Sequence, residues 1–148
     1  MIALACDHTG LALKEEMKVL LDEMELSYQD FGVYEPKSTD YPIWGYRAAK
    51  AVADGLCDRG ILICGTGVGI GIAASKVKGI RVCTCSDVYT AEMSKRHNNS
   101  NVLTMGARVV GVDLARMIAI HWLSAPFEGG RHQRRVDEIT AIENGQTL

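Results

Sequence analysis

Short apolar runs alternate with longer segments of helical periodicity from one end of the chain to the other. The short runs predict strands over residues 2–6, 27–32, 60–64, 79–85 and 101–106. The longer segments predict helices over 11–24, 43–56, the segment from the glycine-rich turn to about 77, 88–96 and 111–124. Runs such as ILIC and VLTM are apolar at both parities, which is typical of parallel strands covered on both faces. The pattern therefore predicts an α/β fold, a three-layer α/β/α Rossmann-like sandwich with a five-stranded parallel sheet that gathers ligands at its carboxyl edge.

Length and charge narrow the class of protein. The 148 residues make one domain, residues 1–148, at roughly 100–200 residues per domain. A net charge of −2 with 47% hydrophobic residues excludes a disordered chain and a broadly basic nucleic-acid binder. The longest uncharged stretch, between Arg59 and Lys76, is shorter than the ~20 apolar residues of a membrane span. Because IALAC follows Met1 without the basic start of a signal peptide, we expect a cytoplasmic protein.

The cysteines and histidines show neither a disulfide framework nor a metal-binding motif. The cysteines are odd in number and are expected to be reduced: Cys6, Cys57, Cys64, Cys83 and Cys85. Cys83 and Cys85 alternate within RVCTC, so they share one face of a strand and are interpreted as small buried hydrophobes. The histidines have no spacing typical of metal ligands: His8, His97, His121 and His132. No metal and no cofactor is predicted.

A glycine-rich segment directly follows the third predicted strand and leads into a helix, over Gly65, Thr66, Gly67, Val68 and Gly69. Glycines expose backbone N–H groups, and the helix N-terminus adds partial positive charge, so we expect an anion here. One alternative is a dinucleotide site built on Gly69, Gly71, Ala74 and Asp87. A dinucleotide and its substrate would crowd so short a chain, however. A turn that serves only packing is the other alternative.

Cys64 is the last residue of the strand before this glycine loop. Backbone donors and the positive end of a helix should raise its thiolate fraction, which would make it a base or a nucleophile. No Asp or Glu occurs between Gly60 and Ser86, so Cys64 is the strongest candidate if the loop supplies a base. A cysteine at a strand end is otherwise often inert.

Asp7 and His8 close the first predicted strand, at the same sheet edge as Cys64. Adjacent residues cannot both point into the core, so this polar pair is expected to line the crevice. Alternatively, Asp7 serves only as the N-cap of the first helix.

Two further polar pairs lie later in the chain. His97 and Asn98 come just before the fifth strand, in a segment that would equally suit a solvated loop. Arg131 and Arg135 share one helical face, a spacing that suits a phosphate group or a surface ion-pair row. The final helix, over VDEITAIENG, has little core left to cover and is expected to extend to a partner subunit.

Taken together, several segments resemble one enzyme family: ACDHTG, TDYP, ILICGTGVGI, RHNNSNVL, GARVVG and EGGRHQRRV. They resemble the ribose-5-phosphate isomerase B family, with which allose-6-phosphate and galactose-6-phosphate isomerases are grouped, in order over almost the whole chain. The resemblance implies an enzyme that interconverts aldose and ketose phosphates with neither metal nor nucleotide. It also implies a homodimer, or a tetramer built from it, whose active sites are shared between subunits.

The resemblance also implies a role for each candidate residue. Cys64 would move a proton between C1 and C2 of the sugar through an enediolate. The loop amides, from Gly65 through Gly67 and Val68 to Gly69, would hold the oxyanion with help from Thr66. His97, with Asp7, would open the sugar ring. Contacts to the sugar and its phosphate would come from His8, Tyr41, Asn98, Arg108, Arg131 and Arg135. Some members use a carboxylate as the base, and since this loop contains none, the chain is similar to the thiol type.

The sequence thus predicts an aldose–ketose isomerase for ribose 5-phosphate and ribulose 5-phosphate, or for a related sugar such as allose, free or phosphorylated. A small nucleotide-binding Rossmann-like module and a non-catalytic oligomeric scaffold are the alternatives.

Overall fold

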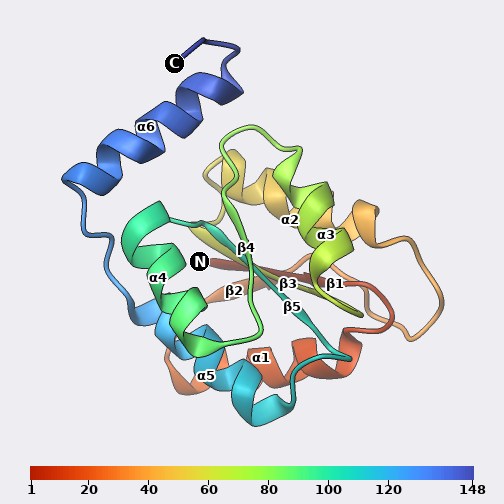
Figure 1. Ribbon diagram of the computed structural model, residues 1–148. Helices are drawn as coiled ribbons and strands as arrows, with labels where there is room; N and C mark the ends of the chain where they lie inside the picture. Colours follow the sequence, from red (N-terminus) through yellow and green to blue (C-terminus); the bar gives the residue numbers. More distant parts are fainter.

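The computed structural model describes residues 1–148 and has a five-stranded sheet at its centre (Figure 1). The strands are β1 (Ile2–Cys6), β2 (Tyr28–Asp30), β3 (Arg59–Cys64), β4 (Val82–Thr84) and β5 (Val102–Gly106). They lie in the order β2-β1-β3-β5-β4, and every pair is parallel. The predicted five-stranded parallel sheet is confirmed.

Helices cover both faces of this sheet: α1 (Leu11–Glu23), α2 (Tyr41–Ala53), α3 (Val68–Ser75), α4 (Val88–Asn98) and α5 (Val112–Ser124). Figure 1 shows α2 and α3 on one face and α1, α4 and α5 on the other. The central strand β3 sends alternate side chains to the two faces, as the pleat requires. Ile61 and Ile63 join the apolar core beneath α1 and α5, whereas Leu62 and Cys64 join the core beneath α2 and α3. The three-layer α/β/α sandwich is therefore confirmed.

Several element boundaries differ from the prediction, and β2, for example, covers 28–30 and not 27–32. Strand β4 covers only 82–84, not 79–85, because Ile80 N–H bonds the Val77 carbonyl in a turn. Helix α2 covers 41–53, not 43–56. It admits Pro42 in its first turn, where the missing N–H costs no hydrogen bond.

The two helices that carry the later polar pairs are longer than predicted. Helix α4 continues through His97 and Asn98, so this pair lies in the last helical turn and not in a loop before β5. Helix α6 (Arg131–Glu143) begins at the arginines themselves, five residues before the predicted VDEITAIENG segment. Arg131 and Arg135 therefore share a helical face, as their spacing indicated.

Helix α6 extends away from the three layers, and the C-terminus lies at its far end (Figure 1). Only His132 and Val136 of this helix are buried. Near its end, the Glu143 carboxylate accepts a hydrogen bond from Gly79 N–H at 3.0 Å. The expectation that the final helix has little core to cover is confirmed, while its contact with a partner stays a prediction. None of the six helices is both long enough and apolar enough to cross a membrane.

Candidate active site

The carboxyl ends of β1, β3 and β5 meet at one edge of the sheet, where the glycine loop lies. Cys64 pairs with Gly106 of β5 and is almost completely buried. Its Sγ accepts a hydrogen bond from Gly67 N–H at 3.1 Å. Cys64 is thus held at the start of the glycine loop with its sulfur directed at the loop backbone.

Gly67 occupies a backbone position that only glycine suits. Its φ is +79°, and a Cβ built there would lie 2.8 Å from the Met105 carbonyl carbon. The loop therefore passes directly over β5 before α3 begins at Val68. This close approach aims the Gly67 amide at the Cys64 sulfur.

The remaining loop amides divide into two kinds. Val68 N–H donates to Thr66 Oγ1 at 3.2 Å, which turns the Thr66 side chain back onto its own loop. The N–H groups of Gly65, Thr66 and Gly69 donate no hydrogen bond within the chain. These three amides are available to an anion at the N-terminus of α3.

Side chains from the neighbouring loops close around this segment. The Arg108 side chain and Thr9 lie beside Gly65, where a Cβ would come within 3.7 Å of Arg108 Cδ and within 3.6 Å of Thr9 Oγ1. The Tyr41 ring lies on Gly69, where a Cβ would meet Tyr41 Cζ at 2.7 Å. Arg108 and Tyr41 are therefore brought to the glycine loop, as the resemblance implied.

Asp7 and His8 lie at the same edge and are each held by a loop. Asp7 Oδ1 accepts hydrogen bonds from Thr9 N–H at 2.8 Å and from Thr9 Oγ1 at 2.6 Å. The cap of α1 is Gly10, so the alternative that Asp7 is merely its N-cap is wrong. His8 Nδ1 accepts from Thr39 N–H at 3.2 Å, so the neutral ring carries its proton on Nε2.

The structure does not bring the other two predicted pairs to this edge within one chain. His97 and Asn98 end α4, which leads into the start of β5 at the amino edge of the sheet (Figure 1). Val102 at that edge lies four residues before Gly106, the register partner of Cys64, a separation of about 13 Å along the strand. The predicted site residues therefore form two groups at opposite ends of the sheet.

The second group is organised around stacked histidines. The ring centroids of His97 and His132 lie 4.3 Å apart, and the two ring planes make an angle of 7°. Glu128 Oε2 lies 3.9 Å from His97 Nε2 and 3.6 Å from His132 Nε2. Burial and the nearby His97 and Arg131 side chains lower the pKa of His132. In the second group, His132 thus stacks directly on the His97 ring.

His132 and Glu128 were not predicted as site residues, because their contact with His97 depends on how α6 lies against α4. The only signal in the sequence is that they lie four residues apart, with Glu128 in the segment before α6 and His132 in its first turn. Ligand atoms of His97, Glu128 and His132 lie within 4.8 Å of one another. The two parallel rings nevertheless direct their in-plane lone pairs side by side, so these do not converge on one metal ion.

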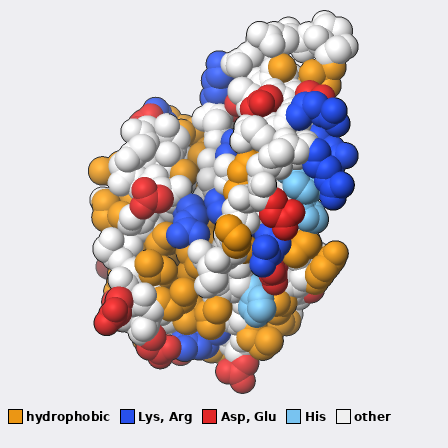
Figure 2. Space-filling view, turned by 90° about the vertical axis from the view of Figure 1, so that its left-hand side faces the viewer, with side chains coloured by type: hydrophobic (Ala, Val, Ile, Leu, Met, Phe, Trp, Pro, Cys, Tyr) orange, Lys and Arg blue, Asp and Glu red, His pale blue; other side chains and the backbone are white.

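Basic side chains gather on α6 beside the histidines, as Figure 2 shows. They include the exposed Arg131 and Arg135. This arrangement suits a phosphate group that approaches from outside the chain.

The residues of the proposed dinucleotide site have other roles in the structure. Gly71 faces β4 and β5, where a Cβ would lie 3.0 Å from Thr84 Oγ1 and 3.1 Å from Thr104 Oγ1. Asp87 is the N-cap of α4 and accepts a hydrogen bond from Thr90 N–H at 2.6 Å. Helix packing and helix capping account for both residues without a nucleotide.

Comparison with known proteins gives a consistent result. A family model described as Ribose/Galactose Isomerase matches residues 2–139. Ribose-5-phosphate isomerase B of Escherichia coli (strain K12) is 54% identical over 142 residues, covering 96% of this chain and 95% of that protein. The structure of Clostridium thermocellum ribose-5-phosphate isomerase B is 49% identical, with a TM-score of 0.95 and 97% of each chain covered. The Mycoplasma genitalium enzyme, crystallised with bound ribulose-5-phosphate, is 41% identical, with a TM-score of 0.91 and 97% and 95% covered.

Proposed function

The chain belongs to the ribose/galactose isomerase family, and we propose that it interconverts ribose 5-phosphate and ribulose 5-phosphate. One observation carries the proposal beyond family membership. The Cys64 sulfur accepts a hydrogen bond from Gly67 N–H at the start of the glycine loop. This loop has free amides and no carboxylate. Removal of a proton next to a carbonyl group needs such a positioned base and such donors.

In the proposed reaction, the Cys64 thiolate removes the proton from C2 of the open-chain aldose. The electron pair of the C–H bond forms the C1–C2 double bond, and the carbonyl oxygen becomes the enediolate oxyanion. The amides of Gly65, Thr66 and Gly69 stabilise that oxygen, each by roughly 3–4 kcal/mol in a dry pocket. A proton then passes from the C2 hydroxyl to the C1 oxygen, and return of the proton from Cys64 to C1 gives the ketose, with its carbonyl group at C2 and a hydroxyl at C1.

Ring opening and phosphate binding require the second group of residues. We propose that two copies of the chain associate so that His97 of the partner subunit meets Asp7 at the glycine loop. Asn98, Arg131 and Arg135 of the partner subunit would come with it, because α4 and α6 carry all of them. His8 and Arg108 would complete the phosphate site from the first chain. The separation of the two groups within one chain supports this shared site.

The proposed chemistry uses a thiolate, backbone amides and cationic side chains, and so needs no metal or cofactor. Activity that persists after treatment with a chelator would support this part of the proposal. Activity lost with the chelator and restored by a divalent metal would contradict it.

The test of the function is direct assay with ribose 5-phosphate, allose 6-phosphate, galactose 6-phosphate and free allose, following the ketose by NMR. We expect ribulose 5-phosphate to form fastest. Preferred turnover of a hexose phosphate would retain the reaction class but change the substrate. The absence of any ketose from all four sugars would overturn the proposal.

A further inference from the structure

Two thiols that the isomerase reaction does not use lie in contact on the other face of the sheet. Cys83 is in β4, and Cys85 is the first residue after that strand. Both belong to the core that contains Trp122 of α5. Their Sγ atoms are 2.7 Å apart. The two sulfurs are therefore in direct contact, with no atom between them. The prediction from RVCTC that both cysteines share one face and are buried is confirmed, and their mutual contact is an additional finding.

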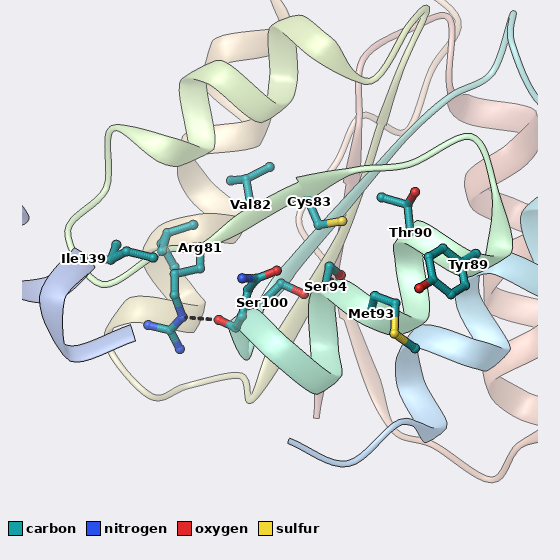
Figure 3. A pocket seen from close by; sticks show the side chains of 11 residues that line it. Arg81, Val82, Cys83, Tyr89, Thr90, Met93, Ser94, Ser100 and Ile139 are labelled. Atoms are coloured by element: carbon teal, nitrogen blue, oxygen red, sulfur yellow. Dashed lines mark hydrogen bonds between the residues drawn. The ribbon is translucent and has the colours of Figure 1, made fainter. Parts of the chain in front are cut away.

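Only one of the two thiols lines an open cavity. A cavity of about 540 Å³ lies between β4, α4 and α6, and Cys83 forms part of its wall with Arg81, Tyr89 and Met93. Figure 3 shows the Cys83 side chain above Ser94 of α4, with Ile139 of α6 at the far side of the cavity. Cys85 is 3% exposed and does not line the cavity. A small reagent in the cavity therefore meets Cys83 first.

The contacts around the pair also distinguish the two sulfurs, because they lower the pKa of Cys83 and raise that of Cys85. The contact with Cys85 and, to a smaller extent, that with Ser94 lower the pKa of Cys83 to about 7 against the opposing effects of burial and of Asp87. The same contact, with burial, raises the pKa of Cys85. The Ser94 hydroxyl is itself held in a chain, 2.9 Å from Ser100 Oγ, which accepts from Trp122 Nε1 at 2.8 Å. Cys83 is thus the accessible thiol of the pair, and Cys85 lies behind it.

We propose that Cys83 and Cys85 form an exchange site for small-molecule disulfides such as glutathione disulfide. The Cys83 thiolate attacks one sulfur of the small disulfide, forms a mixed disulfide and releases the first small thiolate. Cys85 then loses its proton to solvent and attacks Cys83 Sγ, which forms the protein disulfide and releases the second small thiolate. The protein pair loses two electrons and two protons, and the small disulfide becomes two thiols.

The test uses the whole protein treated with glutathione disulfide, alkylated and digested with trypsin. Cleavage after Arg81 and Lys95 releases residues 82–95, a peptide that contains both thiols and no other cysteine. We expect most of this peptide to escape alkylation and to weigh less by two hydrogen atoms, and a dithiol reductant should reverse the change. A peptide that remains fully alkylated on both cysteines after the treatment would overturn the proposal. The readout needs no isomerase activity, so its outcome is independent of the proposed function.

Two variants test the assigned order of attack. In Cys85→Ala the reaction should stop at the mixed disulfide, with glutathione retained on Cys83. In Cys83→Ala no adduct should form, because Cys85 has no open path to the reagent. Cys57→Ala is the matched control, since Cys57 is a buried cysteine outside the cavity, and this variant should form the disulfide like the wild type. Glutathione retained on Cys85 in the Cys83→Ala variant would contradict the assigned order.

Discussion

At the scale of single residues, the candidate site depends on one hydrogen bond. Gly67 N–H donates it, and the sulfur of Cys64 accepts it. The sequence identified both, because a glycine-rich loop after a buried strand has one main structural solution at the carboxyl edge of a parallel sheet. It could not divide the loop amides into those that donate internally and those that remain free. That division depends on the rotamers of Cys64 and Thr66, which local sequence does not determine.

Replacing the Cys64 sulfur should remove the base and leave the fold intact. We expect Cys64→Ala to abolish exchange of the substrate C2 proton with solvent deuterium, because a methyl group cannot accept a proton. Cys57→Ala is the control and should keep wild-type exchange, since Cys57 lies far from the carboxyl edge, just before β3. Proton NMR of ribose 5-phosphate in deuterated buffer measures the exchange. Wild-type exchange by Cys64→Ala would remove this residue from the role of base.

Gly67 can be tested against a glycine with the same backbone conformation and no neighbours. Gly55 has φ +77°, and a Cβ there would meet nothing within 4 Å. Gly55→Ala should therefore cost only the left-handed backbone, about 1–2 kcal/mol of unfolding free energy. Gly67→Ala should cost more, because its Cβ would collide with the Met105 backbone at 2.8 Å. Urea denaturation measures both, and equal losses would show that the Met105 contact has no effect on stability.

At the scale of elements, the sheet and its covering helices followed from periodicity, while the ends of α4 and α6 did not. The apolar pattern determines which faces are buried, so β1, β3 and β5 were predictable. His97 lies in the final turn of α4 because Asn99 ends the helix in a left-handed conformation. The stacking of His97 on His132 requires the tertiary position of α6, which no local pattern encodes.

An ion pair beneath α1 should make stability depend on pH. The Lys14 ammonium is fully buried, 2.7 Å from Asp30 Oδ1, and Lys18 contacts the other carboxylate oxygen. Burial alone would raise the pKa of Asp30, but the hydrogen bonds from Lys14 and Lys18 outweigh it and lower that pKa. A carboxyl whose pKa is lower in the folded state stabilises the fold above its unfolded pKa, and this contribution is lost as pH falls through the folded pKa.

Asp30→Asn should therefore be destabilised by roughly 3–5 kcal/mol at pH 7, because it leaves the Lys14 charge buried and unpaired. Asp54→Asn, which removes the partner of Lys50 in an exposed pair, should lose at most about 1 kcal/mol. The difference in unfolding free energy between the wild type and Asp30→Asn should narrow as the pH falls below the ordinary range of carboxyl pKa values. Urea denaturation at several pH values measures it, and a difference independent of pH would contradict the assignment to the Asp30 charge.

At the scale of the whole molecule, one chain carries two groups of candidate site residues at opposite ends of the sheet. The glycine loop with Asp7 and Arg108 lies at the carboxyl edge, whereas His97 and the α6 arginines belong to the other end. A two-fold dimer turns such an arrangement into two complete sites, because each glycine loop then meets the other half-site of its partner. In the dimer that we propose, the extension of α6 beyond the layers, with little of it buried, would allow this reach.

Complementation between inactive subunits tests this arrangement. Cys64→Ala lacks the base, and Arg135→Ala lacks a phosphate contact worth roughly 1.5–3 kcal/mol. In a mixed dimer with shared sites, one site receives both defects and the other receives neither. Random mixing should therefore restore about a quarter of wild-type turnover, since half of the dimers are mixed and each has one intact site of two. The matched control mixes Cys64→Ala with Asp7→Ala, whose defects lie in the same half-site, so no site is intact and activity should stay absent. Native mass spectrometry would show whether mixed dimers of the first pair form. If they form and yet remain no more active than their parents, the shared site is refuted.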